Sequence, residues 1–263
     1  MMLSLSQGLL GVGSGALVGF SLGLVGGGGS ILAVPLLIYV VGVTDPHIAI
    51  GTSAIAVAAS ALANLWHHGG AGHVKWKCAS VFAAAGVAGA FAGSTVGKWV
   101  DGQKLLIAFA LLMLAVAALM LRKRSSTGRH DVALSLENLP WLLAVGLGAG
   151  GLSGFFGIGG GFLIVPGLML ATGMSILNAV GSSLIGVTAF GLTTAANYAA
   201  SGLVDWVLAG LFVAGGAIGG LVGAQAARSL AAKSGGLHVV FASLIAVVAC
   251  YMLVRTLGIA ASA

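Results

Sequence analysis

The chain has 263 residues, of which 59% are hydrophobic and only 6% are charged, and its mean hydropathy is +1.13. A soluble globular domain is about one quarter charged, so this composition excludes an ordinary soluble protein. Several apolar stretches reach the roughly 20 residues that an α-helix needs to cross a bilayer. The alternation typical of a membrane β-barrel does not occur. The sequence therefore predicts an all-α polytopic membrane protein embedded in the lipid bilayer.

The net charge of +6 does not indicate a nucleic-acid partner, because the basic residues lie between apolar segments, where they set membrane topology. The two cysteines, Cys78 and Cys250, have no metal-ligand spacing. Residues 1–7 contain no Lys or Arg, so we expect the first apolar segment to be retained as a span rather than cleaved. No Walker-type loop, metal cluster or haem ligand pair is present, and no cofactor is expected.

In chain order the predicted membrane segments are 8–25, 30–42, 47–66, 74–98 and 104–121, then 140–156, 160–172, 177–198, 205–228 and 237–256. Residues 122–139 form a polar, basic connector between the two sets. In segments 74–98 and 205–228, glycines recur at every fourth position. This spacing lets a neighbouring helix backbone come close and predicts tight packing.

The second set of segments repeats the first. Residues 26–35 are a run of glycines, then apolar residues and a proline, and the same pattern returns at 157–166. After each copy, residues 51–53 (Gly-Thr-Ser) match residues 181–183 (Gly-Ser-Ser). This agreement predicts an internal duplication, with repeats over 8–121 and 140–257 joined by the cytoplasmic linker 122–139.

The number of membrane crossings depends on the short segments that follow the glycines. If they do not turn back, each half crosses four times. If they do, each half crosses five times and the halves are inverted, so eight to ten membrane segments are expected. The Lys and Arg residues then divide eight to three, with Lys98, Lys104 and Arg255 on the side away from the linker. The positive-inside rule favours this inverted arrangement.

The glycine-to-proline stretches are predicted to break membrane helices, because glycine weakens a helix and proline removes an amide donor. None of the five acidic residues lies at membrane depth, which disfavours a cation carrier. A helix N-terminus can hold an anion without a charged side chain. We therefore expect a small anion to bind between the two breaks, at Gly27, Gly28, Gly29, Ser30, Gly159, Gly160 and Gly161.

Uncharged polar residues follow each break and complete the predicted site. The matched hydroxyls are those of Thr52 and Ser53 in the first half and Ser182 and Ser183 in the second. Further hydroxyl and amide groups follow on the later segment, among them those of Thr194 and Asn197, and Asn197 is included as a ligand. For any one of these residues, a hydrogen bond to a neighbouring helix is the competing interpretation.

Two other classes of protein are weighed against a carrier. A non-transporting membrane subunit or assembly factor remains open, although only residues 122–139 form a sizeable soluble segment for docking. An intramembrane serine protease is suggested by Gly151-Leu152-Ser153-Gly154, but this motif is short and common in a glycine-rich chain. Ser153 is therefore expected to be dispensable, and the protein is not expected to be an enzyme.

Over about residues 8–256 the chain resembles the TauE/SafE family, also called TSUP. The resemblance rests on the paired glycine-to-proline stretches at 26–35 and 157–166, the Gly-Thr-Ser and Gly-Ser-Ser that follow, and the basic linker. It implies a multi-pass permease of the inner (plasma) membrane that carries sulfite, sulfoacetate or another organosulfur anion. The substrate, the direction, the coupling ion and any homo-oligomer are left open by the residues.

Overall fold

Ten α-helices and one 3-10 helix make up most of the chain that the computed structural model describes, which is residues 5–69, 74–122, 132, 134–230 and 236–262. In chain order these are α1 (Leu5–Val25), η1 (Gly26–Leu32), α2 (Ala33–Tyr39), α3 (Pro46–Gly69), α4 (Trp76–Gly97), α5 (Gly102–Arg122), α6 (Leu139–Phe156), α7 (Gly161–Thr172), α8 (Ile176–Ala199), α9 (Trp206–Leu230) and α10 (Gly236–Ser262). Each predicted apolar segment coincides with a helix, and the all-α polytopic prediction is confirmed. Most of the predicted linker, 123–131 and 133, lies outside the described residues.

Seven of the described helices are long and apolar enough to cross a membrane, and three shorter apolar helical stretches accompany them. The helices that follow the glycine-rich stretches are the shortest, with 7 residues in α2 and 12 in α7. At 1.5 Å per residue they extend about 10 and 18 Å, well below the roughly 30 Å of a bilayer core. Neither α2 nor α7 is therefore long enough to cross a bilayer by itself, without the glycine-rich stretch that precedes it.

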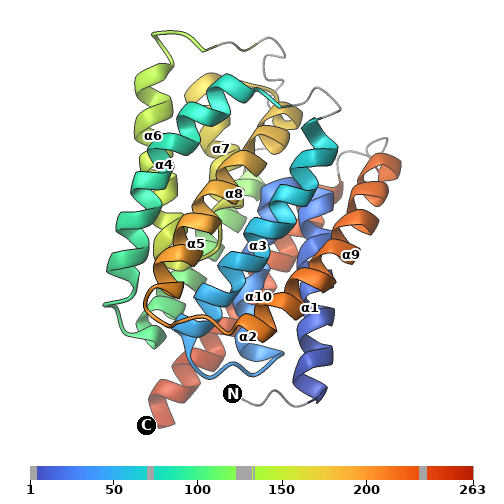
Figure 1. The fold of residues 1–263 in the computed structure, drawn as a ribbon, viewed down its shortest axis with the longest axis vertical. Helices are drawn as coiled ribbons and strands as arrows, with labels where there is room; N and C mark the ends of the chain where they lie inside the picture. The colour runs from blue at the N-terminus through green and yellow to red at the C-terminus, as the bar shows by residue number, and fades with distance from the viewer. Residues whose placement is uncertain (1–4, 70–73, 123–131, 133, 231–235, 263) are drawn as a thin grey trace.

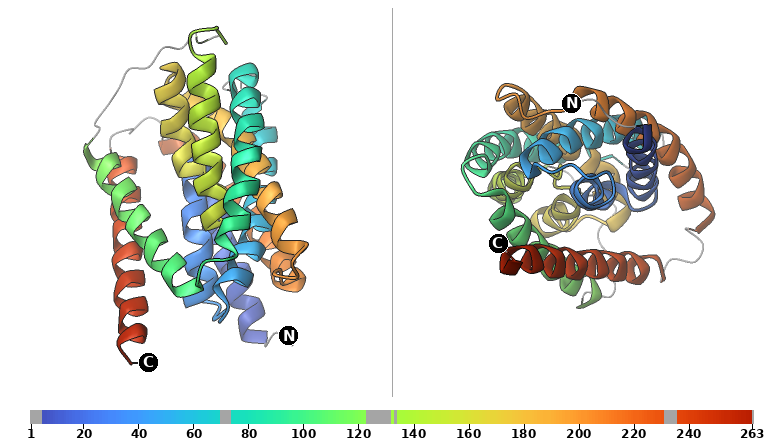
Figure 2. Two further views of the ribbon diagram at one scale, coloured as in Figure 1. Left: turned by 90° about the vertical axis from the view of Figure 1, so that its left-hand side faces the viewer. Right: turned by 90° about the horizontal axis from the view of Figure 1, so that it is seen from below.

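The two halves of the chain start from opposite ends of the molecule. In Figures 1 and 2, α1 begins and α10 ends at the lower end, whereas α6 begins at the upper end. The start of α4 is also at the upper end, with Lys75 just before the helix and Lys77 in its first turn, and Lys98 follows the lower end of α4. This arrangement is the inverted one that the positive-inside rule favours. We call the upper end the linker end and the lower one the opposite end.

The closest helix pairs join one half of the chain to the other. α1 packs along α9, and α4 packs along α6. α9 also packs on α3, and α4 packs on α8. We group the helices by these contacts into two bundles that do not coincide with the sequence halves, and the bundles are joined by extensive packing of α3 on α8. The first bundle is α1, η1, α2, α3 and α9, and the second is α4, α6, α7 and α8.

Glycine makes the α1–α9 and α4–α6 pairs possible. A Cβ atom added to Gly19 would overlap the carbonyl group of Gly216 on α9, and one added to Gly150 would overlap that of Gly86 on α4. The backbones of each pair are therefore in direct contact over a stretch where no side chain intervenes. The glycine spacing seen in the sequence predicts such contacts, and the structure supplies the partners.

α3 and α8 lie at the centre of the molecule, where the two bundles meet. Their apolar windows are 67% buried, against 39–44% for the other candidate spans. α5 and α10 pack mainly on each other and form an outer pair (Figure 2). The seam between α3 and α8 is therefore the interface that any relative movement of the bundles would change.

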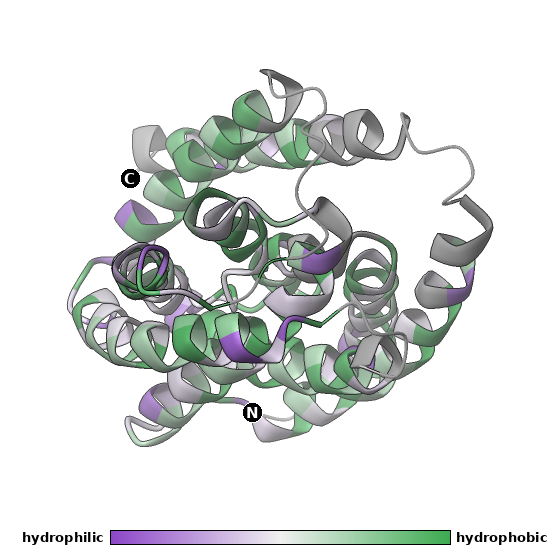
Figure 3. Ribbon diagram, turned by 90° about the horizontal axis from the view of Figure 1, so that it is seen from above, coloured by the Kyte–Doolittle hydropathy of each residue, from purple (hydrophilic) through white to green (hydrophobic). Residues whose placement is uncertain are grey.

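The outer surface has the character expected of a protein in lipid. Hydrophobic residues run along the outer helices, and strongly hydrophilic residues are few (Figure 3). The tryptophans all lie at or near helix ends and are exposed: Trp66, Trp76, Trp99, Trp141 and Trp206. Tryptophan prefers the membrane–water interface, so these positions agree with a belt at each surface rather than with ligand stacking.

We expect Gly19→Ala and Gly150→Ala each to destabilise the protein, because the new Cβ overlaps a carbonyl group of the partner helix. Overpacking of this kind costs about 1–3 kcal/mol. Gly13→Ala and Gly148→Ala are matched controls on α1 and α6, since nothing lies within 4 Å of the added Cβ. Thermal unfolding in detergent, followed by tryptophan fluorescence, measures the difference. Equal melting temperatures for all four variants would contradict the close packing.

Candidate functional site

The second glycine-rich stretch is a sharp break between α6 and α7. Gly157, Gly159 and Gly160 have φ angles of +68°, +62° and +66°, a region that residues with a Cβ rarely adopt. α6 ends at Gly157, and α7 begins at Gly161 with Gly160 as its N-cap. The first amides that bond back into the helix are those of Leu163 and Ile164, which donate to the Gly160 carbonyl at 2.8 and 2.9 Å.

A true helix N-terminus is therefore buried in the interior of the protein, where α7 packs against α6, α8 and η1. Gly161 and Phe162 come before the first amides that donate to a carbonyl of the preceding turn, so they stand where any α-helix leaves its amides without an intrahelical partner. Both residues are buried. The dipole of α7 adds partial positive charge at this point. Amide donors and a positive helix end, without a cationic side chain, are suited to a small anion.

The first glycine-rich stretch has a different geometry. Residues Gly26–Leu32 form the 3-10 helix η1, and α2 begins only at Ala33. Because a 3-10 helix bonds each amide to the carbonyl three residues back, the chain continues through Ser30 without a new α-helix start. Ser30 and Gly29 are buried, and Gly29 lies against the backbone of α1. Gly27 and Gly28 lie within η1, and only their secondary structure is described.

The structure brings the two breaks together. η1 contacts α7 directly, and both contact α8. From α3, the Ser53 hydroxyl donates to the carbonyl of Ile50 at 2.9 Å and approaches the carbonyl of Gly157 at 3.4 Å. A Cβ on Gly159 would lie 2.7 Å from a methyl group of Val57 on α3 and 3.2 Å from one of Val187 on α8. The second break therefore sits against the seam between the two central helices.

The four matched hydroxyls have equivalent partners in the two halves. The Thr52 hydroxyl accepts a bond from the Asp205 amide at 3.0 Å, and the Ser182 hydroxyl accepts one from the Lys75 amide at 2.9 Å. These bonds tie the residues just before α9 and α4 to the central helices. Ser183, like Ser53, donates to a carbonyl three residues back, at 2.7 Å. Each of the four thus has a contact within the protein, and a part in binding remains a prediction.

Asn197 is not brought to the breaks. It lies ten residues beyond Val187 on α8, which is about 15 Å along the helix axis. Its side-chain amide donates to the hydroxyls of Ser94 and Thr95 at 2.6 and 2.9 Å, and its carbonyl oxygen accepts from the Lys98 ammonium at 2.8 Å. Asn197 therefore joins the ends of α8 and α4.

Four carboxylates are described, and all lie outside the predicted site: Glu137 is exposed just before α6, and the three aspartates stand at helix starts. Asp45 accepts from the amide of His47 at 2.8 Å, Asp101 accepts from the amide of Gln103 at 3.1 Å, and Asp205 accepts from that of Leu208 at 3.0 Å. Each of them satisfies amides that a helix start leaves unpaired. The described part of the membrane interior is therefore free of the acidic side chains that would repel an anion.

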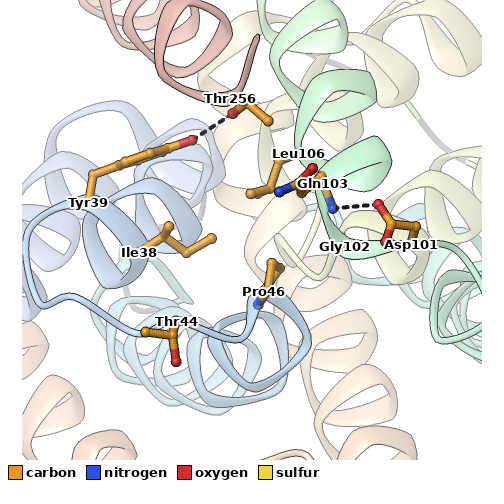
Figure 4. Close-up of a pocket in the computed structure, with 9 residues that line it drawn as sticks. All are labelled: Ile38, Tyr39, Thr44, Pro46, Asp101, Gly102, Gln103, Leu106 and Thr256. Carbon is orange, nitrogen blue, oxygen red and sulfur yellow. Dashed lines mark hydrogen bonds between the residues drawn. The ribbon is translucent and has the colours of Figure 1, made fainter. Parts of the chain in front are cut away.

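A cavity of about 240 Å³ lies at the opposite end, away from both breaks (Figure 4). It is lined by Ile38, Tyr39, Thr44, Pro46, Asp101, Gly102, Gln103, Leu106 and Thr256. The Tyr39 and Thr256 hydroxyls bond each other at 2.9 Å across it. It contains none of the predicted ligands, and the Asp101 carboxylate makes it a poor anion site.

Several polar groups near the seam were not among the ligands predicted from the sequence. The buried side-chain atoms without a hydrogen-bond partner in the described chain include the hydroxyl oxygens of Ser153, Thr194 and Tyr198 and Nδ1 of His47. Ser153 faces the second break: a Cβ on Gly160 would lie 2.8 Å from its hydroxyl oxygen. The only sequence signal for Ser153 is the short glycine-serine motif, and Tyr198 has none.

Comparison with known proteins assigns the chain to a family. The family model described as "Sulfite exporter TauE/SafE" matches residues 10–252. A "Probable membrane transporter protein" of Xylella fastidiosa is 52% identical, with 93% of this chain and 94% of the relative covered. The "Probable membrane transporter protein YdhB" of Bacillus subtilis is 28% identical over 80% of this chain and 86% of the relative. No solved structure matches the chain.

The family and the names of the relatives indicate a membrane transporter rather than an enzyme, in agreement with the sequence analysis. The helices described above supply the membrane-spanning segments such a protein needs. The resemblance read from the two glycine-to-proline stretches is confirmed, and the chain belongs to the TauE/SafE sulfite exporter family of membrane transporters.

Proposed function

We propose that the protein is a secondary transporter of the inner (plasma) membrane that carries sulfite, sulfoacetate or another small organosulfur anion. The observation that carries this proposal is the buried N-terminus of α7, which lies at the second break, beside η1 and the central helices. The description of the matching family, which names sulfite export, supports the same class of substrate.

The anion is held at the junction of the two breaks. One side of the site is the start of α7, with the backbone of Gly159, Gly160 and Gly161, and the other side is η1 with Gly27–Gly29 and Ser30. The Ser53 hydroxyl lies at the same junction, since it approaches the Gly157 carbonyl. Binding at a helix terminus leaves no fixed cation in the site, so the anion can be released again without breaking a strong ion pair.

We further propose that the halves of the chain are inverted repeats, and two pairs of equivalent contacts support this. Gly19 meets Gly216 as Gly150 meets Gly86, and Thr52 bonds the Asp205 amide as Ser182 bonds the Lys75 amide. Transporters built from inverted repeats hold their substrate near the membrane midplane at broken helices. The two breaks in this chain would occupy that position.

Access to the site alternates by movement of the two bundles about the seam between α3 and α8. The sequence halves themselves cannot be the moving bodies, because backbone contacts bind α1 to α9 and α4 to α6 across the halves. Each bundle keeps one break, η1 in the first and the start of α7 in the second. Movement at the seam therefore changes how the two parts of the site face each other.

Purified protein in liposomes is expected to move sulfite across the membrane, measured with a sulfite-sensitive dye on the side opposite to the added anion. The range of substrates would be defined by adding sulfoacetate, thiosulfate or sulfate and measuring how far each one lowers the sulfite flux. Protein-free liposomes supply the background rate. The proposed substrate class would be overturned if sulfite moved no faster than in protein-free liposomes and none of the other anions bound to the protein or competed for it.

The break itself is tested by Gly159→Ala, which we expect to lower sulfite flux at least tenfold. Gly159 has a φ of +62°, and the added Cβ would lie 2.7 Å from a Val57 methyl group, so the break must shift. Gly173→Ala is the matched control at the other end of α7, because its φ is +69° but nothing lies within 4 Å. Equal flux in the two variants at equal folded amounts would show that the position of the break does not matter.

A further inference from the structure

Four buried hydroxyl groups have no hydrogen-bond partner within the described chain. That of Ser175 lies at the N-cap of α8, and the other three belong to side chains that are fully buried: Ser153, Thr194 and Tyr198. We call these residues the hydroxyl line. A buried hydroxyl without a partner lowers stability, and such groups are rare in native proteins. Each of the three therefore needs a physical explanation.

The neighbouring serines and threonines show that a partner is normally available. Hydroxyl groups in these helices bond a carbonyl about one turn back, as those of Ser53, Ser94, Thr172, Ser183, Thr188 and Thr256 do. This is the usual behaviour of serine and threonine inside a helix. Ser153 and Thr194 are also helical, but neither hydroxyl group makes such a bond.

The positions of the hydroxyl line follow the seam from the second break toward the opposite end. Ser153 adjoins Gly160 at the start of α7. On α8, Gly191 faces Ala58 of α3, and Tyr198 faces Gly51 of α3. Thr194 lies three residues after Gly191 and four before Tyr198. Residues at this spacing share one helix face, so Thr194 lies on the side of α8 that meets α3.

The line is long enough to lead from the break to the opposite end. Val187 lies beside Gly159 of the break. From Val187, Thr194 is about 10 Å and Tyr198 about 16 Å along the α8 axis. The α3 residues that face this part of α8 are small. They are Ala58, whose Cβ would lie 3.0 Å from a Cβ on Gly191, and Gly51, which lies against the Cβ of Tyr198. A modest separation of α3 and α8 would therefore open a passage past Thr194 and Tyr198, which would begin at the break where Ser153 of α6 lies beside Gly160.

Polar and cationic groups surround the end of the line beyond Tyr198. The His47 ring lies 6.3 Å from the Tyr198 ring, and its Nδ1 also has no partner within the described chain. The Lys98 ammonium lies 6.0 Å from the centre of the Tyr198 ring, and its acceptors are the uncharged oxygens of Asn197 and Ser201. Asp45 adds a negative charge at this end, but its carboxylate accepts from the amide of His47.

We propose that Ser153, Thr194 and Tyr198 are the hydrogen-bond donors of the substrate path from the α7 N-terminus to the end of the membrane opposite the linker. A small oxyanion leaving the break would exchange the amides of α7 for the hydroxyl groups of the line, then reach the Lys98 end. Each hydroxyl can donate one hydrogen bond to an anion oxygen. This inference rests on the proposed anion transport and reverses the expectation that Ser153 is dispensable.

The test combines transport with stability, because a path role and a structural role predict opposite patterns. Ser153→Ala, Thr194→Val and Tyr198→Phe each remove one hydroxyl that has no partner in the folded protein. We expect the melting temperature to stay equal or rise. Sulfite flux per folded protein in liposomes is expected to fall about tenfold, the effect of one lost hydrogen bond to a charged group.

Thr188→Val is the matched control on the same helix. The Thr188 hydroxyl is buried but donates to the Leu184 carbonyl at 2.8 Å, so its loss should lower the melting temperature and leave flux per folded protein unchanged. Wild-type flux in Thr194→Val and Tyr198→Phe, with an active wild-type protein, would overturn the hydroxyl line alone. A wild-type protein that moves no anion would overturn the proposed function, and the line with it.

Discussion

Direct contact between helix backbones at glycine is the constraint on which the rest of this structure depends. At Gly19 and Gly216, and again at Gly86 and Gly150, no side chain separates the paired helices. This contact binds α9 to α1 and α4 to α6, so α4 and α9 each belong to the bundle built on the other half of the chain. Once those helices are exchanged, α3 and α8 face each other at the centre, and the two breaks meet beside them. Packing between small residues, rather than ion pairs, therefore determines where the candidate site lies.

Properties local to the chain could be predicted from the sequence, and properties that depend on a partner could not. Apolar length predicted the helices, and the glycine-to-proline stretches predicted both breaks and the family. Four-residue glycine spacing predicted close packing without naming the partner, since any helix fits against a glycine face. The same limit applies to polar side chains. Nothing in the spacing indicates that Asn197 bonds Ser94, or that the Ser153 hydroxyl has no partner while that of Ser183 does.

The two breaks differ in a way that bears on mechanism. The second starts a new α-helix at Gly161, because three glycines with positive φ allow the chain to turn, whereas the first continues as a 3-10 helix through Ser30. The second break thus presents the N-terminus of an α-helix, whereas the first presents a continuous 3-10 helix that is packed against α1. The unpartnered hydroxyl groups lie on the side of the terminus, at Ser153 and along α8. Retaining them costs stability, which proteins commonly accept at sites where ligands bind.

Movement of two cross-half bundles about the α3–α8 seam is the central claim, and engineered disulfides test it most directly. In a protein whose two free cysteines, Cys78 and Cys250, are replaced by alanine, Gly11→Cys with Leu211→Cys joins α1 to α9 within one bundle, where the Cβ separation is 4.0 Å. Ala58→Cys with Gly191→Cys joins α3 to α8 across the seam, starting from 3.0 Å. The account predicts that oxidation leaves sulfite flux intact in the first pair and abolishes it in the second, with recovery on reduction. Full flux through the oxidised seam pair, or loss of flux in the α1–α9 pair alone, would contradict it.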